Sequence, residues 1–528
     1  MIDGAMQSFP LTLDRIVDHA AKWHPDTEVV TAREDGTLAR IGYAALRDRA
    51  WKVSNVLAGL GVTAGARVAT LAWNSQAHVE AWYAIMGMGA VCHTLNPRLT
   101  ATQLAWMLGQ SEARILVVSA DLLPLALKVA ADAPGIDKLL VIDGEAEAAL
   151  HEGFDVTPLD PLIDQANARF DWGDFDETAP SGLCFTSGST GSPKGVTYTH
   201  RGCFLHTLRL LQADMLGLSR DDVVLPVVPM FHANAWGLPF AVPAAGATLA
   251  LPGRHTDGAS LARLIAEANV TIAVGVPTVW LGLAEHLEAT GTTLPSLRRI
   301  LVGGASMPPA LMARLERQLG VEVQTSWGMT ELTPVGTFGV LGDLERQAAV
   351  SGRPALGVDL MLADANGDPL PDQRDTEGHL HVRGASVIER YFGQEQSATD
   401  ANGWFDTGDL ARIDRKGNLM ITGRAKDLIK SGGEWINPAE IEAVVGALPQ
   451  VSLAAVIGRS DEKWGERPLL LVELRQDQEI SDQDLLASLR GRVASWWIPD
   501  AVVRVPDMPL AATGKIDKIR LRATFSAA

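Results

Sequence analysis

Residues 182–199 read GLCFTSGSTGSPKGVTYT, and the interpretation of the whole chain starts here. An apolar run is followed by a loop rich in glycine and hydroxyl groups with one lysine, and then by a strand-like segment. Such a loop can present backbone N–H groups, hydroxyl donors and a cation to phosphates. It is not a Walker A loop, because Pro193 precedes Lys194 and Gly195 follows it. We interpret residues 186–195 as an anion cradle, although the composition is also typical of a surface turn.

The pattern around this stretch predicts an α/β fold with parallel-rich sheets covered by helices. Through residue 330, short β-branched runs such as 67–73, 114–119 and 298–304 precede amphipathic stretches. From about residue 350, short strands divided by turn signals predict a small β-rich subdomain at 350–426. A separate set of helices and strands follows and predicts a small C-terminal α+β domain. The expected domains are therefore residues 1–426 and 427–528.

Length, charge and composition exclude several classes of protein. The chain has 528 residues, so at least two domains are expected. A net charge of −18, with no basic stripe, argues against nucleic acid or an anionic membrane as a partner. Residues 223–253 contain no charged side chain, but their five prolines, His232 and Asn234 predict buried core and no integral membrane segment.

Cysteine usage and the first residues bear on location. Cys92, Cys184 and Cys203 form no C-x-x-C pair, and their odd number suits a reducing compartment. The first 13 residues, MIDGAMQSFPLTL, show no basic region followed by an apolar run, so no secretory signal is visible. These observations predict a cytoplasmic protein without a structural zinc site.

Four further segments contain residues suited to chemistry. Residues 326–331, SWGMTE, place an aromatic ring beside a carboxylate that could hold a cation, although a core Trp before a capped helix is the alternative. Residues 404–409, WFDTGD, offer a carboxylate to ribose hydroxyls, or form a turn. Residues 423–435, GRAKDLIKSGGEW, combine charges with a glycine turn and could equally be a solvated hairpin. Residues 509–516, PLAATGKI, put a lysine on a glycine-hinged loop that can reach a cleft, whereas a lone exposed lysine is usually a surface residue.

Taken together and in this order, the five segments resemble the adenylate-forming superfamily. This superfamily contains acyl-CoA synthetases, adenylation domains of peptide synthetases and beetle luciferases, and the resemblance spans nearly the whole chain. Residues 230–237 (MFHANAWG), 274–280 (VGVPTVW) and 426–442 look like the medium- and long-chain fatty-acyl-CoA ligase branch, which includes ligases for 3-(methylthio)propionate. The resemblance implies that the C-terminal domain is mobile and rotates between two half-reactions.

The resemblance also implies the reaction and its residues. ATP would activate a carboxylic acid as an acyl-adenylate, and CoA would then receive the acyl group. Lys515, Glu331 and His232 would be catalytic, and Thr186 and Glu331 would hold Mg²⁺. The acyl substrate would contact His232, Trp236, Gly303 and Gly304. The nucleotide would contact Thr186, Ser187, Gly188, Ser189, Thr190, Gly191, Lys194, Gly304, Ala305, Ser326, Trp327, Gly328, Met329, Thr330, Glu331, Asp409, Arg424, Lys426, Lys430, Trp435 and Lys515.

Some of these residues have a more specific implied role. Trp327 would flank the adenine in place of the more usual Tyr, which puts any contact from the lost phenol in doubt. Asp409 and Arg424 would take the ribose hydroxyls, and Lys426 matches the hinge position. The hairpin around Lys430 and Trp435 would border the nucleotide and thiol channel.

Alternatives remain open at this point. A stand-alone adenylation enzyme would load a carrier protein, but only 13 residues follow Lys515, which favours CoA as the acceptor. A non-catalytic nucleotide-binding regulator is disfavoured because Glu331 and Lys515 are both present, and oxidative luciferase chemistry is improbable. Medium-chain fatty acids and 3-(methylthio)propionate are the leading substrates. The branch also implies a homodimer.

Overall fold

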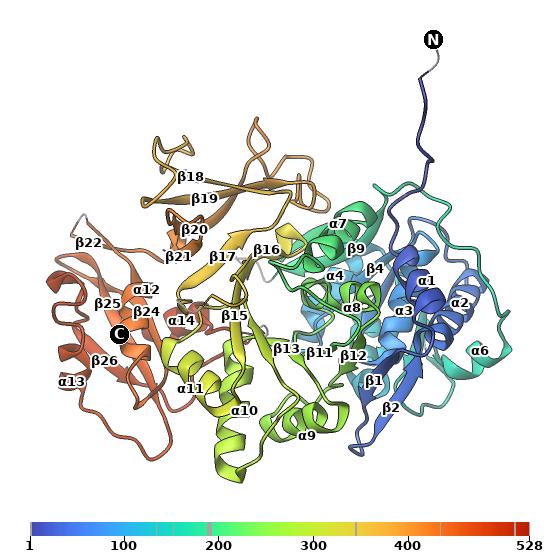
Figure 1. The fold of residues 1–528 in the computed structure, drawn as a ribbon, viewed down its shortest axis with the longest axis horizontal. Coiled ribbons are helices and arrows are strands. Elements are labelled where there is room, and N and C mark those ends of the chain that lie inside the picture. The colour runs from blue at the N-terminus through green and yellow to red at the C-terminus, as the bar shows by residue number, and fades with distance from the viewer. Residues whose placement is uncertain are drawn as a thin grey trace.

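The computed structural model describes residues 3–133, 135–151, 153–186, 193–343, 346–432, 434–511 and 514–526. A large N-terminal part contains two sheets flanked by helices, and a small C-terminal part contains a third sheet (Figure 1). This arrangement confirms the predicted α/β class with a large N-terminal domain and a small C-terminal domain. The short helix η4 (Ala425–Asp427) lies where the domain boundary was expected, and the boundary itself stays a prediction.

The sheet that contains the glycine-rich stretch has the strand order β10-β9-β4-β3-β5-β6-β8-β7. From β9 to β8 neighbouring strands run parallel, whereas the edge strands β10 and β7 pair antiparallel. The strands are β3 (Arg67–Leu71), β4 (Val91–Thr94), β5 (Ile115–Ser119), β6 (Lys138–Ile142), β7 (Ala149–His151), β8 (Phe154–Pro158), β9 (Pro180–Thr186) and β10 (Lys194–Thr199). β5 is buried along its whole length, as expected for a parallel sheet covered on both faces.

The second sheet runs in the order β18-β19-β20-β21-β17-β16-β15-β14-β13-β11-β12-β1-β2. Its parallel region contains β1 (Glu28–Ala32), β11 (Val223–Pro226), β12 (Thr248–Leu251), β13 (Ile272–Gly275), β14 (Arg299–Val302) and β15 (Glu322–Gly328), with β2 (Leu38–Gly42) antiparallel at the edge. An antiparallel extension contains β16 (Val335–Phe338), β17 (Val350–Pro354), β18 (Val358–Ala363), β19 (Glu377–Gly384), β20 (Phe405–Ile413) and β21 (Leu419–Arg424). This extension contains the short strands expected after residue 350.

Helices cover both sheets. They are α1 (Asp14–Trp23), α2 (Tyr43–Gly59), α3 (Gln76–Gly87), α4 (Ala101–Ser111), η1 (Ala120–Leu122), α5 (Leu123–Asp132), α6 (Asp160–Gln165), α7 (His200–Leu210), η2 (Ala233–Gly237), α8 (Leu238–Ala245), α9 (Gly258–Ala268), α10 (Pro277–Thr290), α11 (Pro309–Leu319) and η3 (Thr330–Leu332). The uncharged stretch 223–253 forms β11, η2, α8 and β12 and is largely buried. Within the described residues, no helix has the length and apolar character needed to cross a membrane.

The C-terminal sheet has the order β23-β22-β25-β24, with β26 parallel to β25. Its elements are β22 (Ile429–Ser431), β23 (Glu434–Ile436), α12 (Pro438–Gly446), β24 (Val451–Asp461), β25 (Gly465–Leu474), α13 (Asp482–Ala487), η5 (Ser495–Trp497), β26 (Ala501–Arg504) and α14 (Lys518–Phe525). Apolar residues of α12, β24 and β25 form a separate core in this domain. α12 packs against β21 of the large domain, and Asn437, which precedes α12, donates its side-chain N–H to the Thr422 carbonyl of β21 at 2.7 Å.

Asn74 joins the two large sheets where their strands end. It follows β3, and its amide nitrogen donates to the carbonyls of Pro226 and Val228 at 3.0 and 2.9 Å. Its side-chain oxygen accepts from the backbone N–H of Met230 at 2.7 Å. Because of these bonds, the loops after the strands of the two sheets meet at one edge, where binding sites of α/β sheets usually form.

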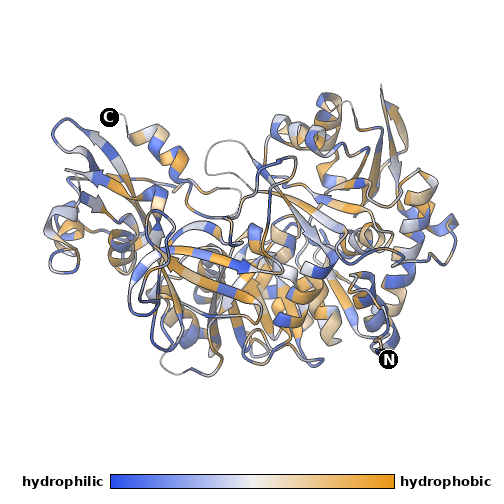
Figure 2. Ribbon diagram, turned by 90° about the horizontal axis from the view of Figure 1, so that it is seen from above, coloured by the Kyte–Doolittle hydropathy of each residue, from blue (hydrophilic) through white to orange (hydrophobic). Residues whose placement is uncertain are grey.

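Figure 2 shows hydrophobic residues concentrated along the strands, with polar residues frequent on the outer helices.

Candidate active site

Asp409 lies at the centre of a group formed by β15, β20 and β21. It is directly opposite Arg424 in the β20–β21 ladder, and Arg424 Nε lies 2.6 Å from Asp409 Oδ1. Trp327, near the end of β15, donates its indole N–H to Asp409 Oδ2 at 2.9 Å. Asp409 is only 2% exposed, and this burial raises the pKa of its carboxyl while Arg424 acts in the opposite direction. Each carboxylate oxygen thus has a donor or cation from the protein.

Trp327 has a polar partner that the sequence did not reveal. Trp327 stands where the resembled superfamily usually has Tyr, so a contact made by the tyrosine hydroxyl is lost. The indole N–H supplies a hydrogen bond of its own, which a buried Trp normally requires. The ring therefore has a fixed orientation relative to the Asp409 carboxylate.

Lys515 reaches this group from the C-terminal domain. Burial lowers the pKa of its ammonium group to about 8, with Arg424 acting in the same direction and Asp409 and Glu331 opposing it. The Gly514 carbonyl accepts from Thr278 Oγ1 at 3.4 Å, so the loop that bears Lys515 contacts helix α10 of the large domain. The structure thus brings the predicted lysine to the predicted carboxylates across the domain interface.

His232 and Trp236 lie in the segment between β11 and α8. Burial lowers the pKa of His232 to about 4, and the positive charges of Lys515 and Arg98 contribute. Residues 233–236 have φ values of 46, 55, 47 and 54°, a left-handed conformation that is rare for residues other than glycine. This turn places Trp236, which is only 6% exposed, against the two glycines that follow β14.

Gly303 and Gly304 leave the space that Trp236 and Lys515 occupy. A Cβ atom at Gly303 would lie 2.5 Å from Ser326 Oγ and 3.0 Å from Trp236 Cη2. A Cβ atom at Gly304 would lie 3.5 Å from Trp236 Cζ2 and 3.8 Å from Lys515 Cε, and Gly304 has a φ of 76°. Gly303 therefore has no room for a side chain, whereas Gly304 is favoured by its left-handed φ; the approach of the acyl chain and adenylate to this backbone stays a prediction.

Glu331 in η3 is held by a residue that no motif singled out. The hydroxyl of Tyr391 donates to Glu331 Oε1 at 2.9 Å, and Glu331 is 8% exposed. Lys194 Nζ lies 4.7 Å from the centre of the Tyr391 ring. Tyr391 therefore contacts two predicted site residues from different segments. The sequence around it, ERYFG, gave no signal that could have found it.

The structure describes the two ends of the glycine-rich loop. Thr186 ends β9 and Lys194 begins β10, and the two residues are paired across the ladder. The predicted residues Ser187, Gly188, Ser189, Thr190 and Gly191 lie outside the described residues. The ends of the predicted cradle therefore lie next to each other.

The remaining predicted residues of β14 and β15 lie around the same edge. Ser326 Oγ donates to the Val302 carbonyl at 3.1 Å, and Tyr198 donates to the Thr330 carbonyl at 3.0 Å. Gly328 is the last residue of β15, and Met329 follows it. Ala305 is exposed after Gly304. These contacts fix the backbone that precedes Glu331.

The hinge and hairpin residues lie on the C-terminal domain. Lys426 is in η4, where partial burial lowers the pKa of its ammonium group and the charge of Asp427 acts in the opposite direction. Lys430 Nζ lies 5.3 Å from the ring centre of Trp435, which is 53% exposed, so these two residues contact each other at the surface of the β22–β23 hairpin. The hairpin is not at the centre of the Asp409 group but contributes a separate surface.

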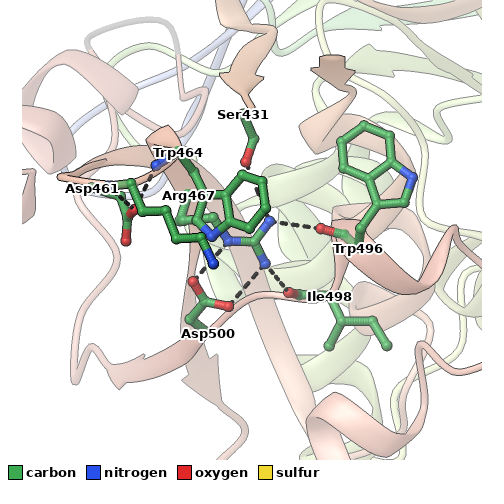
Figure 3. Close-up of polar contacts among 8 residues, drawn as sticks. Ser431, Asp461, Trp464, Arg467, Trp496, Ile498 and Asp500 are labelled. Carbon is green, nitrogen blue, oxygen red and sulfur yellow. Dashed lines mark hydrogen bonds and ion pairs between the residues drawn. The ribbon is translucent and has the colours of Figure 1, made fainter. Parts of the chain in front are cut away.

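Arg467 connects this hairpin to the loop after η5. Its Nη1 donates to Ser431 Oγ and to the Trp496 carbonyl at 3.3 and 2.7 Å, and its Nη2 donates to the Ile498 carbonyl at 3.1 Å (Figure 3). Both oxygens of Asp500 accept from the same guanidinium at 2.8 Å. The guanidinium thus holds the hairpin and the loop as one unit.

The fold and this group of residues are those of an adenylating enzyme, and the sequence agrees. Residues 17–392 match the AMP-binding enzyme family, and residues 440–515 match the AMP-binding enzyme C-terminal domain. The chain therefore belongs to the AMP-binding enzymes, which confirms the resemblance noted in the sequence.

Curated relatives are similar over their full length. The chain is 41% identical to 3-methylmercaptopropionyl-CoA ligase of Ruegeria pomeroyi, covering 99% of this chain and 98% of the relative. It is 40% identical to a medium-chain-fatty-acid–CoA ligase of Ectopseudomonas oleovorans, covering 99% and 97%. The anthranilate CoA ligase AuaEII in complex with anthranoyl-AMP superposes with a TM-score of 0.88 at 25% identity, covering 99% of both chains. ATP-bound MatB from Rhodopseudomonas palustris gives 0.83 at 26%, covering 98% and 99%.

Proposed function

We propose that the protein is an AMP-forming carboxylate–CoA ligase. A carboxylate oxygen attacks the α-phosphorus of ATP, which forms acyl-AMP and releases pyrophosphate. The CoA thiolate then attacks the acyl carbon, which forms the thioester and releases AMP. The observation that carries the proposal is the contact of the Lys515 loop with the large domain: the Gly514 carbonyl accepts from Thr278 Oγ1, and Lys515 Cε lies 3.8 Å from where a Cβ atom of Gly304 would be. The charges of Asp409 and Glu331 act on the same ammonium group. The full-length similarity to relatives named CoA ligases supports it.

The first half-reaction brings two anions together, so its rate depends on charge stabilisation. The Lys515 ammonium group is suited to lie between the substrate carboxylate and the α-phosphate. Asp409 and Arg424 are suited to bind the ribose hydroxyls, since a carboxylate accepts and a guanidinium donates. Trp327 would flank the adenine while its N–H holds Asp409.

The donor atoms at the β9 end fit a Mg²⁺ ion. Glu331 supplies a carboxylate and Thr186 a hydroxyl, and both are the oxygen ligands that this hard cation prefers. With these two protein ligands, the remaining ligands of the ion would be phosphate oxygens and water. Bound there, Mg²⁺ would neutralise phosphate charge.

The second half-reaction would use another face of the C-terminal domain. We propose that rotation about Lys426 withdraws Lys515 and presents the hairpin of Lys430 and Trp435 to the thiol substrate. The exposure of Trp435 and the rigid attachment of the hairpin through Arg467 support this role. The domain boundary at residue 426 belongs to the same proposal.

The Trp236 contact favours a compact acyl pocket. Its ring packs against Gly303 and Gly304, where a long chain would have to displace it. Of the two leading substrates, this geometry favours 3-(methylthio)propionate over a medium-chain fatty acid. A homodimer and a cytoplasmic location stay predictions from the sequence.

The test is AMP release with ATP, Mg²⁺ and CoA over acids from acetate to palmitate, including 3-(methylthio)propionate. We expect a maximum at short acids and a loss of activity in Lys515→Ala. A maximum at eight carbons or more would instead favour fatty acids and a displaced Trp236. Release at the level of Lys515→Ala with every acid would contradict the ligase and leave carrier loading or non-catalytic nucleotide binding.

A further inference from the structure

Tyr391 links two parts of the nucleotide site that are far apart in the sequence. We propose that Tyr391 is a positioning residue that orients Glu331 for the cation and Lys194 for the phosphates. The proposal rests on the proposed function, since it assigns Tyr391 to the ATP half of that reaction. It adds a residue that lies outside every motif recognised in the sequence.

The first observation is the attachment of Glu331. Tyr391 Oη donates to Glu331 Oε1 at 2.9 Å. In the same segment as Tyr391, the backbone N–H of Ile388 donates to the Glu331 carbonyl, also at 2.9 Å. The segment 388–391 therefore holds both the main chain and the side chain of Glu331. A carboxylate held in this way has less freedom to rotate away from a ligand.

The second observation is the attachment of β10. Lys194 Nζ lies 4.7 Å from the centre of the Tyr391 ring, within the range of a cation–π interaction. The next residue, Phe392, donates its backbone N–H to the Gly195 carbonyl at 2.8 Å. One short segment thus fixes the end of the glycine-rich loop as well as Glu331.

A tyrosine is chemically suited to this position. A phenol is neutral near pH 7 and carries one O–H donor, which here points at the Glu331 carboxylate. A lysine here would neutralise the carboxylate and compete with a cation, whereas a phenol orients it and leaves its charge. Partners that orient metal-binding carboxylates act in the same way in other proteins.

Two substitutions separate the hydroxyl from the ring. Tyr391→Phe removes the bond to Glu331 and keeps the ring beside Lys194, whereas Tyr391→Leu removes both. The readout is binding of Mn²⁺, followed by electron paramagnetic resonance, to the full-length protein with α,β-methylene-ATP. We expect Tyr391→Phe to weaken Mn²⁺ binding roughly 10- to 100-fold, the usual effect of losing such a partner. We expect only Tyr391→Leu to weaken binding of the analogue without metal as well.

Tyr43→Phe is the matched control. It removes another buried tyrosine hydroxyl, which donates to the Ala247 carbonyl at 2.6 Å, outside the candidate site. It is expected to lower the melting temperature without shifting Mn²⁺ binding. Combining Tyr391→Phe with Glu331→Gln gives a further test, because the effect of Tyr391→Phe should disappear when the carboxylate is absent.

Two results would overturn the proposal: Mn²⁺ binding to Tyr391→Phe that equals the wild type, or a Tyr391→Phe effect that persists beside Glu331→Gln. If Tyr391→Phe does not fold, Tyr391→His and Tyr391→Leu replace it, since imidazole can donate to Glu331 and leucine cannot. Equal Mn²⁺ binding by those two would then contradict the proposal. Pyrophosphate exchange by the wild type tests the proposed function separately.

Discussion

The hydrogen bond from the Trp327 indole to Asp409 predicts how far kcat/KM for ATP falls when that N–H is removed. Trp327→Phe keeps an aromatic ring beside the adenine position but removes the 2.9 Å donor to Asp409 Oδ2. Because the acceptor is a carboxylate that is only 2% exposed, the bond is worth about 1.5–3 kcal/mol. At 1.4 kcal/mol per factor of ten, kcat/KM for ATP should fall by roughly 10- to 150-fold.

The assay is pyrophosphate exchange at saturating carboxylic acid without CoA, which isolates the first half-reaction. Trp280→Phe is the matched control, because Trp280 is fully buried and, among the described residues, its indole nitrogen has no hydrogen-bond partner. This control should lose stability through packing and keep kcat/KM for ATP within about threefold of the wild type.

A double-mutant cycle with Asp409→Asn tests the cause. If the indole acts through the Asp409 carboxylate, the loss caused by Trp327→Phe should be much smaller when that charge is absent. Fully additive losses, or a Trp327→Phe enzyme with unchanged kcat/KM for ATP, would refute the reasoning. The ring would then contribute by stacking alone.

Two further predictions concern Lys515 and Gly303. In the enzyme without bound substrate, the pKa of the Lys515 ammonium group is lowered to about 8, so the cationic form is present below that pH and is lost above it. In the wild type, kcat/KM for ATP should therefore fall roughly tenfold per pH unit above about 8. Lys515→Arg should abolish this fall, and thioester formation from supplied acyl-AMP should not show it. A fall that persists in Lys515→Arg would exclude Lys515 as its origin. Gly303→Ala places a methyl group 2.5 Å from Ser326 Oγ and 3.0 Å from Trp236 Cη2. KM for the acid should therefore rise by roughly 5- to 100-fold and KM for ATP should rise as well, as separate saturation curves would show. An unchanged KM for the acid would mean that Trp236 does not line the acyl pocket.

The sequence predicted those parts of the fold that local patterns encode. Strands at 67–71, 115–119 and 299–302 agree with the β-branched runs, and the texture change after residue 350 corresponds to the antiparallel extension. The apolar spacing predicts a helix over residues 482–496, but the helix ends at Ala487, and Gly491 adopts a φ of 72° in the turn that follows. A glycine in a left-handed turn interrupts the helix although the apolar spacing continues.

The motifs also identified most residues of the candidate site, but not their partners. Asp409 and Arg424 were found as separate motif residues, and their pairing follows only from the β20–β21 register. Tyr391 lies 60 residues from Glu331, and spacing along a chain contains no information about a contact at that separation. The donor on Trp327 was missed for the same reason, since its acceptor is 82 residues away.

The backbone at Trp236 shows most clearly why a motif does not determine a pocket. Left-handed conformation costs roughly 1–2 kcal/mol for each residue other than glycine, so residues 233–236 would not adopt it on local preference. Contacts from distant elements hold it: His206 packs against Gly237, and Gly303 and Gly304 leave room for the Trp236 ring. Strain of this kind concentrates at functional sites, where the surrounding structure over-determines it. The motif MFHANAWG therefore contains the residue proposed to limit the acyl pocket, whereas α7 and the glycines after β14 decide where its ring lies.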